Sequence, residues 1–203
     1  MPRAILHAVN APDIAPETAA PNEPVRRARR WRKDLMFFAI AACVIGLDQL
    51  TKWLVRDHLA LYEQWPRDAF LHMRIIHVVN SGAAFGILQG QTPFLIMTSV
   101  LGLAAIVMYY VYPPMDHGLI RVALGMQLGG AVGNFIDRVR VGEVTDFIDV
   151  GRFPTFNVAD SSISISIVAV LLFFAMQEAE AAKKRPDPAV TPPDASSRPA
   201  HED

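Results

Sequence analysis

Between residues 137 and 160 the chain carries four aspartates, whose side chains offer acid–base or metal-binding chemistry. The sequence has no cysteine nucleophile in a suitable setting, no His-Glu-x-x-His zinc motif, no Gly-x-Ser-x-Gly elbow and no Gly-x-x-x-x-Gly-Lys phosphate loop. Carboxylates therefore remain as the candidate catalysts. Two carboxyl groups held close together share one proton, so one activates water while the other protonates a scissile carbonyl. This chemistry hydrolyses peptides, although the residues alone do not say which two aspartates form the pair.

Two other interpretations stay open at this point. Clustered acids also bind Mg²⁺ for phosphoryl or phosphatidyl transfer, although the Asp-x-x-Asp-Gly spacing of membrane alcohol phosphotransferases is absent. The acids could instead satisfy one another in a helical scaffold that has no catalytic activity. Loss of activity with a chelator would distinguish the metal-dependent transferase from a metal-free pair of aspartates. A scaffold without catalytic activity would keep its function after Asp→Asn changes.

Two pairs of polar residues lie four positions apart, so each pair shares one face of a helix that contains it. Asp48 and Lys52 predict an ion pair that fixes a helix end. Asn134 and Arg138 form the second pair, beside Asp137. The planar guanidinium of Arg138 could hold a carboxylate or a substrate carbonyl, or the side chain could simply extend to a membrane interface.

Charge is concentrated at the two ends of the chain. Residues 1–33 hold ten of the 39 Asp, Glu, Lys and Arg residues, residues 178–203 hold another ten, and the 144 residues between them hold only 19. That central part is far less charged than soluble domains, which are about 25% charged. We therefore expect a membrane-embedded body, 34–177, between a basic disordered tail and a Pro-rich disordered tail. A net charge of −1 and the lack of a long basic stripe argue against nucleic-acid binding.

Four apolar segments approach the roughly 20 residues that a helix needs to cross the hydrocarbon core of a membrane. The fourth begins with alternating Ser and Ile, as a strand would, but its apolar continuation is too long for an isolated strand, which favours a helix. The sequence thus predicts an all-α membrane protein with four transmembrane helices. The segments run from about Leu35 to Val55, Pro93 to Tyr112, Gly118 to Phe135 and Ala159 to Met176.

Basic residues predict the orientation of these spans. Six of them directly precede the first span, and Lys183, Lys184 and Arg185 follow the fourth. Since basic residues beside spans favour the cytoplasmic side, both termini are expected in the cytoplasm. Residues 56–92 and 136–158 are then expected at the opposite, outer face.

Two further patterns predict local structure. Partly alternating β-branched residues at 70–79, before the turn signal of Asn80-Ser-Gly, predict a small β element at the outer face. Glycines recur every four residues on one face of the third span, at Gly125, Gly129 and Gly133. Such spacing permits close approach to a neighbouring helix.

Five blocks of this sequence together resemble the bacterial lipoprotein signal peptidases, also called signal peptidase II. They occur in the family's order and at compatible spacing. The blocks are Asp48-Gln-Leu-Thr-Lys52, Asn80-Ser-Gly-Ala-Ala-Phe-Gly86, Gly129-Gly-Ala-Val-Gly-Asn-Phe-Ile-Asp-Arg138, Val144-Thr-Asp-Phe147 and Phe156-Asn-Val-Ala-Asp-Ser161.

The resemblance implies roles for individual residues. By the family's pattern the catalytic pair falls on Asp146 and Asp160. Residues that correspond to positions lining the site are Asn80, Asn134, Arg138 and Asn157, and residues at positions that look structural are Asp48, Lys52 and Asp137. Asp149 has no counterpart in the pattern, so we expect it to be a solvated loop residue. Only 13 residues separate Asp146 from Asp160, a short loop that could narrow the range of substrates.

The resemblance also implies a fold and an activity. The fold is four transmembrane helices with an outer β-cradle and a half-helix. The activity is removal of the signal peptide from prolipoproteins by cleavage before a diacylglyceryl-modified cysteine, without a metal or other cofactor. The expected partners are those prolipoproteins and membrane lipid, with no nucleic acid, and the chain is expected to be monomeric. Its expected location is the bacterial inner membrane, with the active site at the periplasmic face.

Overall fold

The computed structural model describes residues 23–70, 73–82, 87–113 and 117–183. Four helices account for most of this part of the chain: α1 Glu23–His58, α2 Thr92–Val111, α3 Gly118–Arg140 and α4 Val158–Lys183. All four are long and apolar enough to cross a membrane. The predicted spans are therefore confirmed, and the fourth segment is a helix despite its alternating start. The chain is a multi-pass membrane protein.

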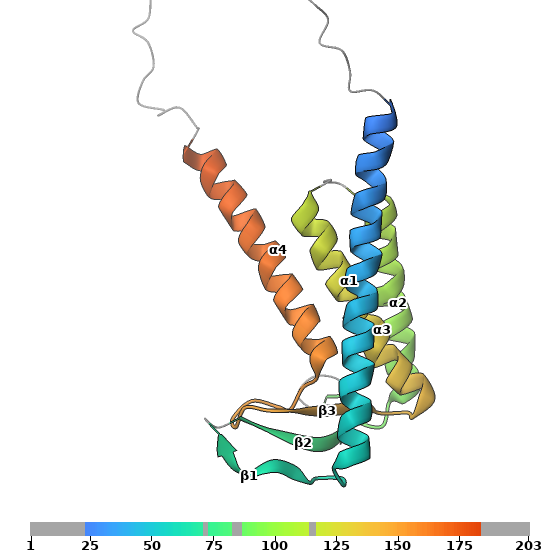
Figure 1. The fold of residues 1–203 in the computed structure, drawn as a ribbon, viewed down its shortest axis with the longest axis vertical. Helices are drawn as coiled ribbons and strands as arrows, with labels where there is room; N and C mark the ends of the chain where they lie inside the picture. Colours follow the sequence, from blue (N-terminus) through green and yellow to red (C-terminus); the bar gives the residue numbers. More distant parts are fainter. Residues whose placement is uncertain (1–22, 71–72, 83–86, 114–116, 184–203) are drawn as a thin grey trace, which may run out of the picture.

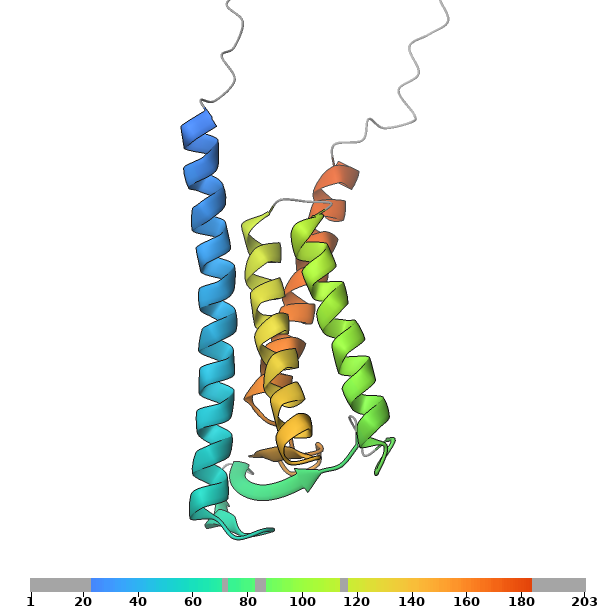
Figure 2. The same ribbon diagram turned by 90° about the vertical axis from the view of Figure 1, so that its right-hand side faces the viewer.

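The four helices lie roughly along one axis, and the sheet lies at one end of the bundle, beside the last turns of α1 (Figure 1). The start of α1 and the end of α4 lie at the opposite end, as Figure 2 also shows. Both helices extend beyond the predicted membrane body, because α1 begins at Glu23 and α4 ends at Lys183. Residues 23–33 and 178–183, expected to be disordered, are therefore helical. The rest of both predicted tails, 1–22 and 184–203, lies outside the described residues.

The predicted β element is larger in the structure than the sequence indicates. Strands β1 Gln64–Phe70, β2 Met73–Asn80 and β3 Val144–Asp149 form one antiparallel sheet in the order β1-β2-β3. Asp146 therefore lies on a strand and not in a loop. The half-helix that the resemblance implies is not among the helices of the described residues.

Helix α3 is the centre of the bundle and packs against each of the other three helices. Its predicted glycine face is confirmed. A methyl group on Gly129 would lie 2.6 Å from Val44 Cβ and 2.8 Å from the Ala41 carbonyl of α1, so a larger residue would push α1 away. Gly133 approaches Asp48 in the same manner. Close packing of this kind supplies much of the affinity between helices in lipid, where no hydrophobic effect drives them together.

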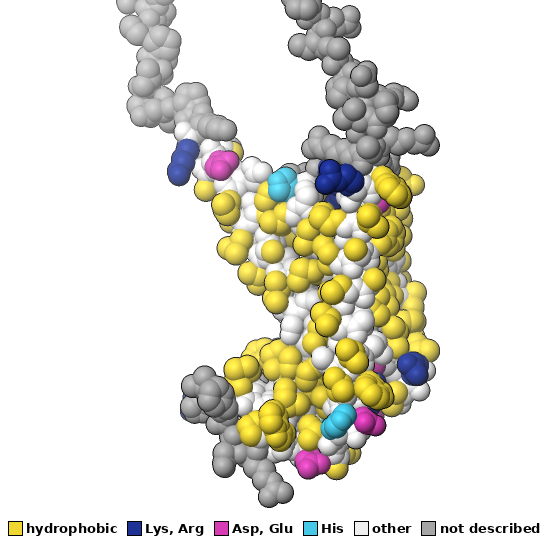
Figure 3. Space-filling model, in the orientation of Figure 1, with side chains coloured by type: hydrophobic (Ala, Val, Ile, Leu, Met, Phe, Trp, Pro, Cys, Tyr) yellow, Lys and Arg dark blue, Asp and Glu magenta, His cyan; other side chains and the backbone are white. Residues whose placement is uncertain are grey.

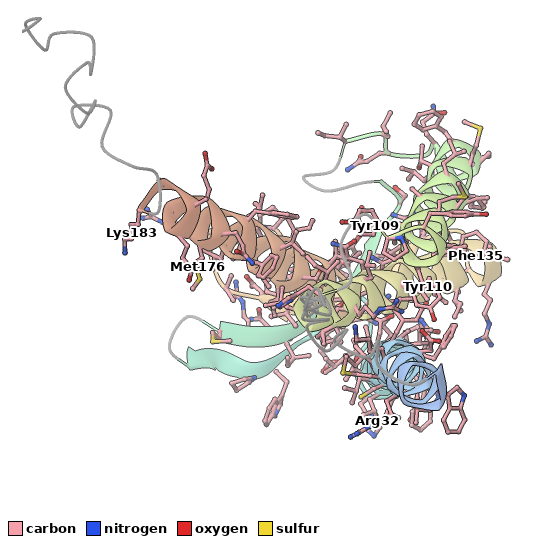
Figure 4. All side chains as sticks on the ribbon, turned by 90° about the horizontal axis from the view of Figure 1, so that it is seen from above. Arg32, Tyr109, Tyr110, Phe135, Met176 and Lys183 are labelled. Carbon is pink, nitrogen blue, oxygen red and sulfur yellow. The ribbon has the colours of Figure 1, made fainter. Side chains whose placement is uncertain are left out.

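Away from the sheet, aromatic and polar contacts hold α1, α2 and α3 together. Phe37 stacks on Tyr110 with a 4.1 Å separation of the ring centroids. The Tyr110 hydroxyl donates to Asp34 at 2.8 Å, and Arg121 forms an ion pair with the same carboxylate at 2.9 Å. Seen along the helices, α4 leans away from the other three toward its end at Lys183 (Figure 4).

Candidate active site

The first turn of α4 is built as a capping box. Asn157 precedes the helix, and its side-chain oxygen accepts a hydrogen bond from the Asp160 backbone N–H at 2.9 Å. In return, the Asp160 carboxylate accepts from the Asn157 backbone N–H at 3.3 Å. This reciprocal pairing satisfies two N–H groups that a helix start leaves without partners. It also fixes Asp160 where the helix dipole favours a negative charge.

Asp146 reaches the same place from the sheet. It pairs with Val78 of β2, so its side chain lies on the same face as that of Asn80 two residues further on. Asn80 Nδ2 donates to one carboxylate oxygen at 2.9 Å and Asn157 Nδ2 to the other at 2.7 Å. Burial, which leaves 2% of Asp146 exposed, raises its pKa to about 6, with Asp160 adding to the rise, while the two amides and Lys52 oppose it.

Both oxygens of the Asp160 carboxylate also accept hydrogen bonds. Asn134 Nδ2 donates to Asp160 Oδ1 at 2.7 Å, while the other oxygen accepts from the backbone of Asn157. Each of the four oxygens of Asp146 and Asp160 thus accepts an N–H hydrogen bond. Asn157 joins the two carboxyl groups directly, since it bonds to both.

A cavity of about 1000 Å³ opens in front of these carboxyl groups. Figure 3 shows that the surface is hollowed here, between α4 and the sheet. Polar residues from five parts of the chain line the cavity, namely Asn80, Asn134, Arg138, Glu143, Asp146 and Asp160. Apolar side chains, including Phe153, Phe156, Ile163 and Ile165, form another part of its wall. The combination suits a substrate with both a polar backbone and an apolar part.

Arg138 of α3 forms part of the cavity wall. Its Nη2 donates to the backbone oxygen of Gly82 at 3.2 Å, which ties α3 to the segment after β2. Gly82 N in turn donates to Asn80 Oδ1 at 2.9 Å, so Asn80 is held at both ends of its side chain. Both polar atoms of the Asn80 amide therefore have hydrogen-bond partners at the site.

Behind the cavity lies a buried ionic cluster of Asp48, Lys52 and Asp137. Lys52 Nζ lies 2.8 Å from Asp48 and 3.0 Å from Asp137, and all three side chains are 2% exposed or less. The predicted Asp48–Lys52 ion pair is therefore present. Asp48 also accepts from the Ala159 backbone N–H at 2.9 Å, which connects α1 to the first turn of α4. The cluster thus joins three helices directly beside the two cavity aspartates.

The structure brings most of the predicted site residues together, and it differs from the sequence expectations at Asn157 and at Asp149. Asn157, expected to line the site, is fully buried and lies behind the carboxyl groups instead of on the cavity wall. Asp149, expected to be a solvated loop residue, is only 6% exposed and ends β3. That expectation is wrong, because the strand continues to Asp149 and Arg74 of β2 forms an ion pair with it. Burial opposes ionisation of Asp149, but the Arg74 and Gly151 hydrogen bonds outweigh it and lower its pKa.

The sequence analysis missed two residues that support the site. Gln49 Nε2 donates to both Asp48 and Asp137, at 3.2 Å each, so it braces the ionic cluster. Arg56 lies 3.7 Å from Asp137 and donates to Thr145 at 3.0 Å. Gln49 stands inside the first matching block, and Arg56 follows Lys52 by four residues, so helical spacing could have suggested both.

The fold and the site together define a multi-pass membrane protein with a paired-carboxylate site at one end of its helices. A family model described as signal peptidase (SPase) II matches residues 40–176. The chain therefore belongs to the signal peptidase II family. It is a membrane hydrolase, a peptidase that processes signal peptides.

Individual relatives agree with this assignment. A lipoprotein signal peptidase of Dehalococcoides mccartyi is 44% identical over 146 residues, which cover 70% of this chain and 90% of the relative. That of Shouchella clausii is 43% identical over 144 residues, covering 70% and 94%. A solved bacterial membrane enzyme, determined by the in meso method at 2.3 Å resolution, aligns with a TM-score of 0.66 at 33% identity. The aligned region covers 74% of this chain and 93% of that structure.

Proposed function

We propose that this peptidase removes the signal peptide from prolipoproteins and cuts before a diacylglyceryl-modified cysteine. We further propose that it is an aspartic endopeptidase in which Asp146 and Asp160 form the catalytic pair. The names of its relatives support the substrate class. The observation that carries the mechanism is the juxtaposition of two carboxyl groups at one cavity, the buried Asp146 and the half-buried Asp160, each joined to Asn157.

In the proposed reaction the pair holds one proton. One carboxylate takes a proton from water as the water oxygen bonds to the scissile carbonyl carbon, while the other carboxyl group gives its proton to the carbonyl oxygen. Collapse of the tetrahedral intermediate breaks the C–N bond. The first aspartate then gives a proton to the leaving nitrogen and the second recovers one from the hydroxyl group, so the pair ends singly protonated. The raised pKa of Asp146, about 6, favours retention of this shared proton.

The amide side chains have a supporting role in this proposal. Asn80, Asn134 and Asn157 donate to the two carboxylates, so they orient the pair more directly than they bind substrate. Arg138 lines the cavity and uses Nη2 on Gly82. Because a guanidinium carries five N–H groups, Arg138 also has donors for a carbonyl oxygen of the substrate. N–H donors at every carboxylate oxygen of the pair favour chemistry without a metal ion.

The same proposal places the protein in the bacterial inner membrane as a monomer. Both carboxyl groups of the proposed pair belong to the same chain and bond to the same Asn157, so the proposal needs no partner chain to form the pair. Basic residues gather at the helix ends away from the sheet, where α1 carries Arg32 and Lys33 and α4 ends at Lys183. By the positive-inside rule that end faces the cytoplasm, with both termini, and the cavity faces the periplasm. Membrane lipid would surround the apolar helix surfaces and the acyl chains of the substrate.

The test is cleavage of a diacylglyceryl-modified prolipoprotein by the purified protein in detergent with excess EDTA. Wild type should cleave, whereas Asp146→Asn and Asp160→Asn should each lose about 10²–10⁴-fold in kcat. Asp57→Asn is the matched control, since its carboxylate is 57% exposed on α1. Activity lost on chelation would refute a metal-free reaction. Normal turnover by a folded Asp146→Asn or Asp160→Asn variant would refute the catalytic pair.

A further inference from the structure

Lys52 has more partners than the ion pair with Asp48 requires. Its ammonium group has three N–H donors and is completely buried. Two of the donors meet Asp48 at 2.8 Å and Asp137 at 3.0 Å. The third donates to Asn134 Oδ1 at 2.9 Å. Every hydrogen of the charged group is therefore used, and one of them is directed at a side chain that holds the proposed catalytic pair.

That contact is one of three hydrogen bonds that fix which way the amide of Asn134 faces. The oxygen and nitrogen of a carboxamide have nearly the same shape, so only hydrogen bonds distinguish its two orientations. Here the oxygen accepts from Lys52 and, at 3.2 Å, from Asn157 Nδ2, while the nitrogen donates to Asp160 at 2.7 Å. A turned amide would place N–H groups against the Lys52 ammonium and an oxygen against the Asp160 carboxylate. Both contacts would then be repulsive.

A second connection leads from Lys52 to the same aspartate. Lys52 holds one oxygen of Asp48, and the other oxygen accepts from the Ala159 backbone N–H at 2.9 Å. Ala159 directly precedes Asp160 in the first turn of α4. The ammonium therefore supports both the side-chain partner of Asp160 and the backbone that carries it.

We propose that Lys52 is a positioning residue for catalysis, which acts mainly through Asn134 by keeping the amide N–H of Asn134 on Asp160. The role goes beyond joining helices, and it rests on the proposed function of Asp160. Lys52 itself does not line the cavity in which the substrate is proposed to bind. Its removal should therefore reduce the rate of the chemical step more than it weakens substrate binding.

A double-mutant cycle tests the inference. The variants are Lys52→Met, Asn134→Ala and the combination of the two, each assayed for kcat, KM and thermal midpoint in detergent. Lys52→Met alone should lower kcat by about 10²-fold, as expected when a catalytic group is misplaced by about 1 Å, and should change KM less than about threefold. In the Asn134→Ala background the same change should lower kcat by less than about threefold, because residues in one network are not additive.

Arg121→Met is the matched control. Arg121 is also a buried cation paired with an aspartate, Asp34 at 2.9 Å, but it lies in the first turn of α3, the helix whose opposite end carries Asn134. Its loss should lower the thermal midpoint while kcat stays within about twofold. An equal loss of kcat in Arg121→Met and Lys52→Met would overturn the proposal, because it would show that any buried ion pair has this effect.

The remaining outcomes are also decisive. Equal effects of Lys52→Met with and without Asn134, or a change confined to KM, would overturn the proposal. If Lys52→Met does not fold, the double variant Lys52→Met/Asp137→Asn takes its place in the cycle, because it removes one buried negative charge together with the positive charge. If neither variant folds, the role of Lys52 is structural and the inference is overturned. Asp160→Asn is assayed in parallel. If that variant is active, the proposed function fails; if it is inactive while the cycle is additive, only the role of Lys52 fails.

Discussion

Gly130 connects the packing of α3 against α4 to the position of the cavity aspartate Asp160. It faces α4 at the turn that carries Asp160, whereas its neighbour Gly129 faces α1. A Cβ at Gly130 would lie 2.5 Å from the Ala159 carbonyl oxygen and 2.6 Å from Ser162 Oγ. The backbone contact is about 0.9 Å inside the 3.4 Å at which ordinary contact begins. Because that atom is backbone, Gly130→Ala must shift the start of α4 and not merely a flexible side chain.

The expected size of the effect follows from this overlap. Overpacking of this kind costs about 1–3 kcal/mol, which corresponds to roughly 2–4 °C in Tm for each kcal/mol in a chain of this length. The shift also moves Asp160 relative to Asp146. A displacement approaching 1 Å at a reacting group costs about 10²-fold in rate. Gly130→Ala should therefore lower both Tm and kcat, the latter by about 10- to 100-fold.

Substitution of two other glycines, Gly125 and Gly102, should change the stability of the protein without changing its activity. Gly125→Ala meets the Phe37 carbonyl of α1 at 2.8 Å, more than a turn of α3 further from the sheet, so it should lower Tm without affecting kcat beyond about twofold. At Gly102 of α2 nothing lies within 4 Å of the added methyl group. Gly102→Ala should raise stability by about 0.5–1 kcal/mol. Thermal unfolding in detergent and turnover of a lipid-modified prolipoprotein measure both quantities. A destabilised Gly130→Ala with normal kcat, or an equal loss of kcat in Gly125→Ala, would refute this reasoning.

Two further predictions concern pH. The Asn80 amide favours the ionised form of Asp146, so Asn80→Ala should raise the pKa of Asp146 above about 6. The pair then keeps its proton to higher pH, and the alkaline limb of the kcat/KM profile should shift to higher pH. An alkaline limb that stays in place or shifts to lower pH would contradict the proposed role of Asp146. The lowered pKa of Asp149 means that its ion pair with Arg74 stabilises the fold above the ordinary aspartate pKa and that this stabilisation is lost as pH falls. Because Arg74 is 34% exposed, Arg74→Met should cost only about 0.5–1 kcal/mol at pH 7. Unfolding measured from pH 7 to pH 3 should show a smaller acid-dependent loss in that variant, and identical pH profiles would contradict the assignment.

The spans could be predicted because their signal is local. A run of apolar residues is sufficient to define each helix, and the spacing of Gly125, Gly129 and Gly133 indicates which face of α3 packs against a neighbour. Strand β3 was not predicted, because it has only six residues, includes two aspartates and pairs with β2 more than 60 residues earlier. Asp149 was misplaced for the same reason, since its partner Arg74 comes from β2.

The residues of the site were easier to predict than their connections. The resemblance selects Asn134 and Asn157 as site residues, but it does not tell that their amides bond to the carboxyl groups. Helical spacing alone puts Asp48 beside Lys52, and it does not reveal that Lys52 also reaches Asn134 on another helix. Such contacts depend on how α1, α3 and α4 approach one another, and the sequence of a single helix does not contain that information.

The two aspartates of the cavity are placed by different kinds of structure, and this makes them differently vulnerable. Asp160 is fixed locally, since the capping box with Asn157 needs only a spacing of three residues. Asp146 is fixed by strand register, and a slip of one residue would turn its side chain to the other face of the sheet. The register of β2 and β3 shifts between Ile75 and Val78, directly before the pairing of Val78 with Asp146. A change of length in β2 should therefore displace Asp146 and leave the Asp160 cap intact, so the irregularity in β2 is part of what aligns the pair.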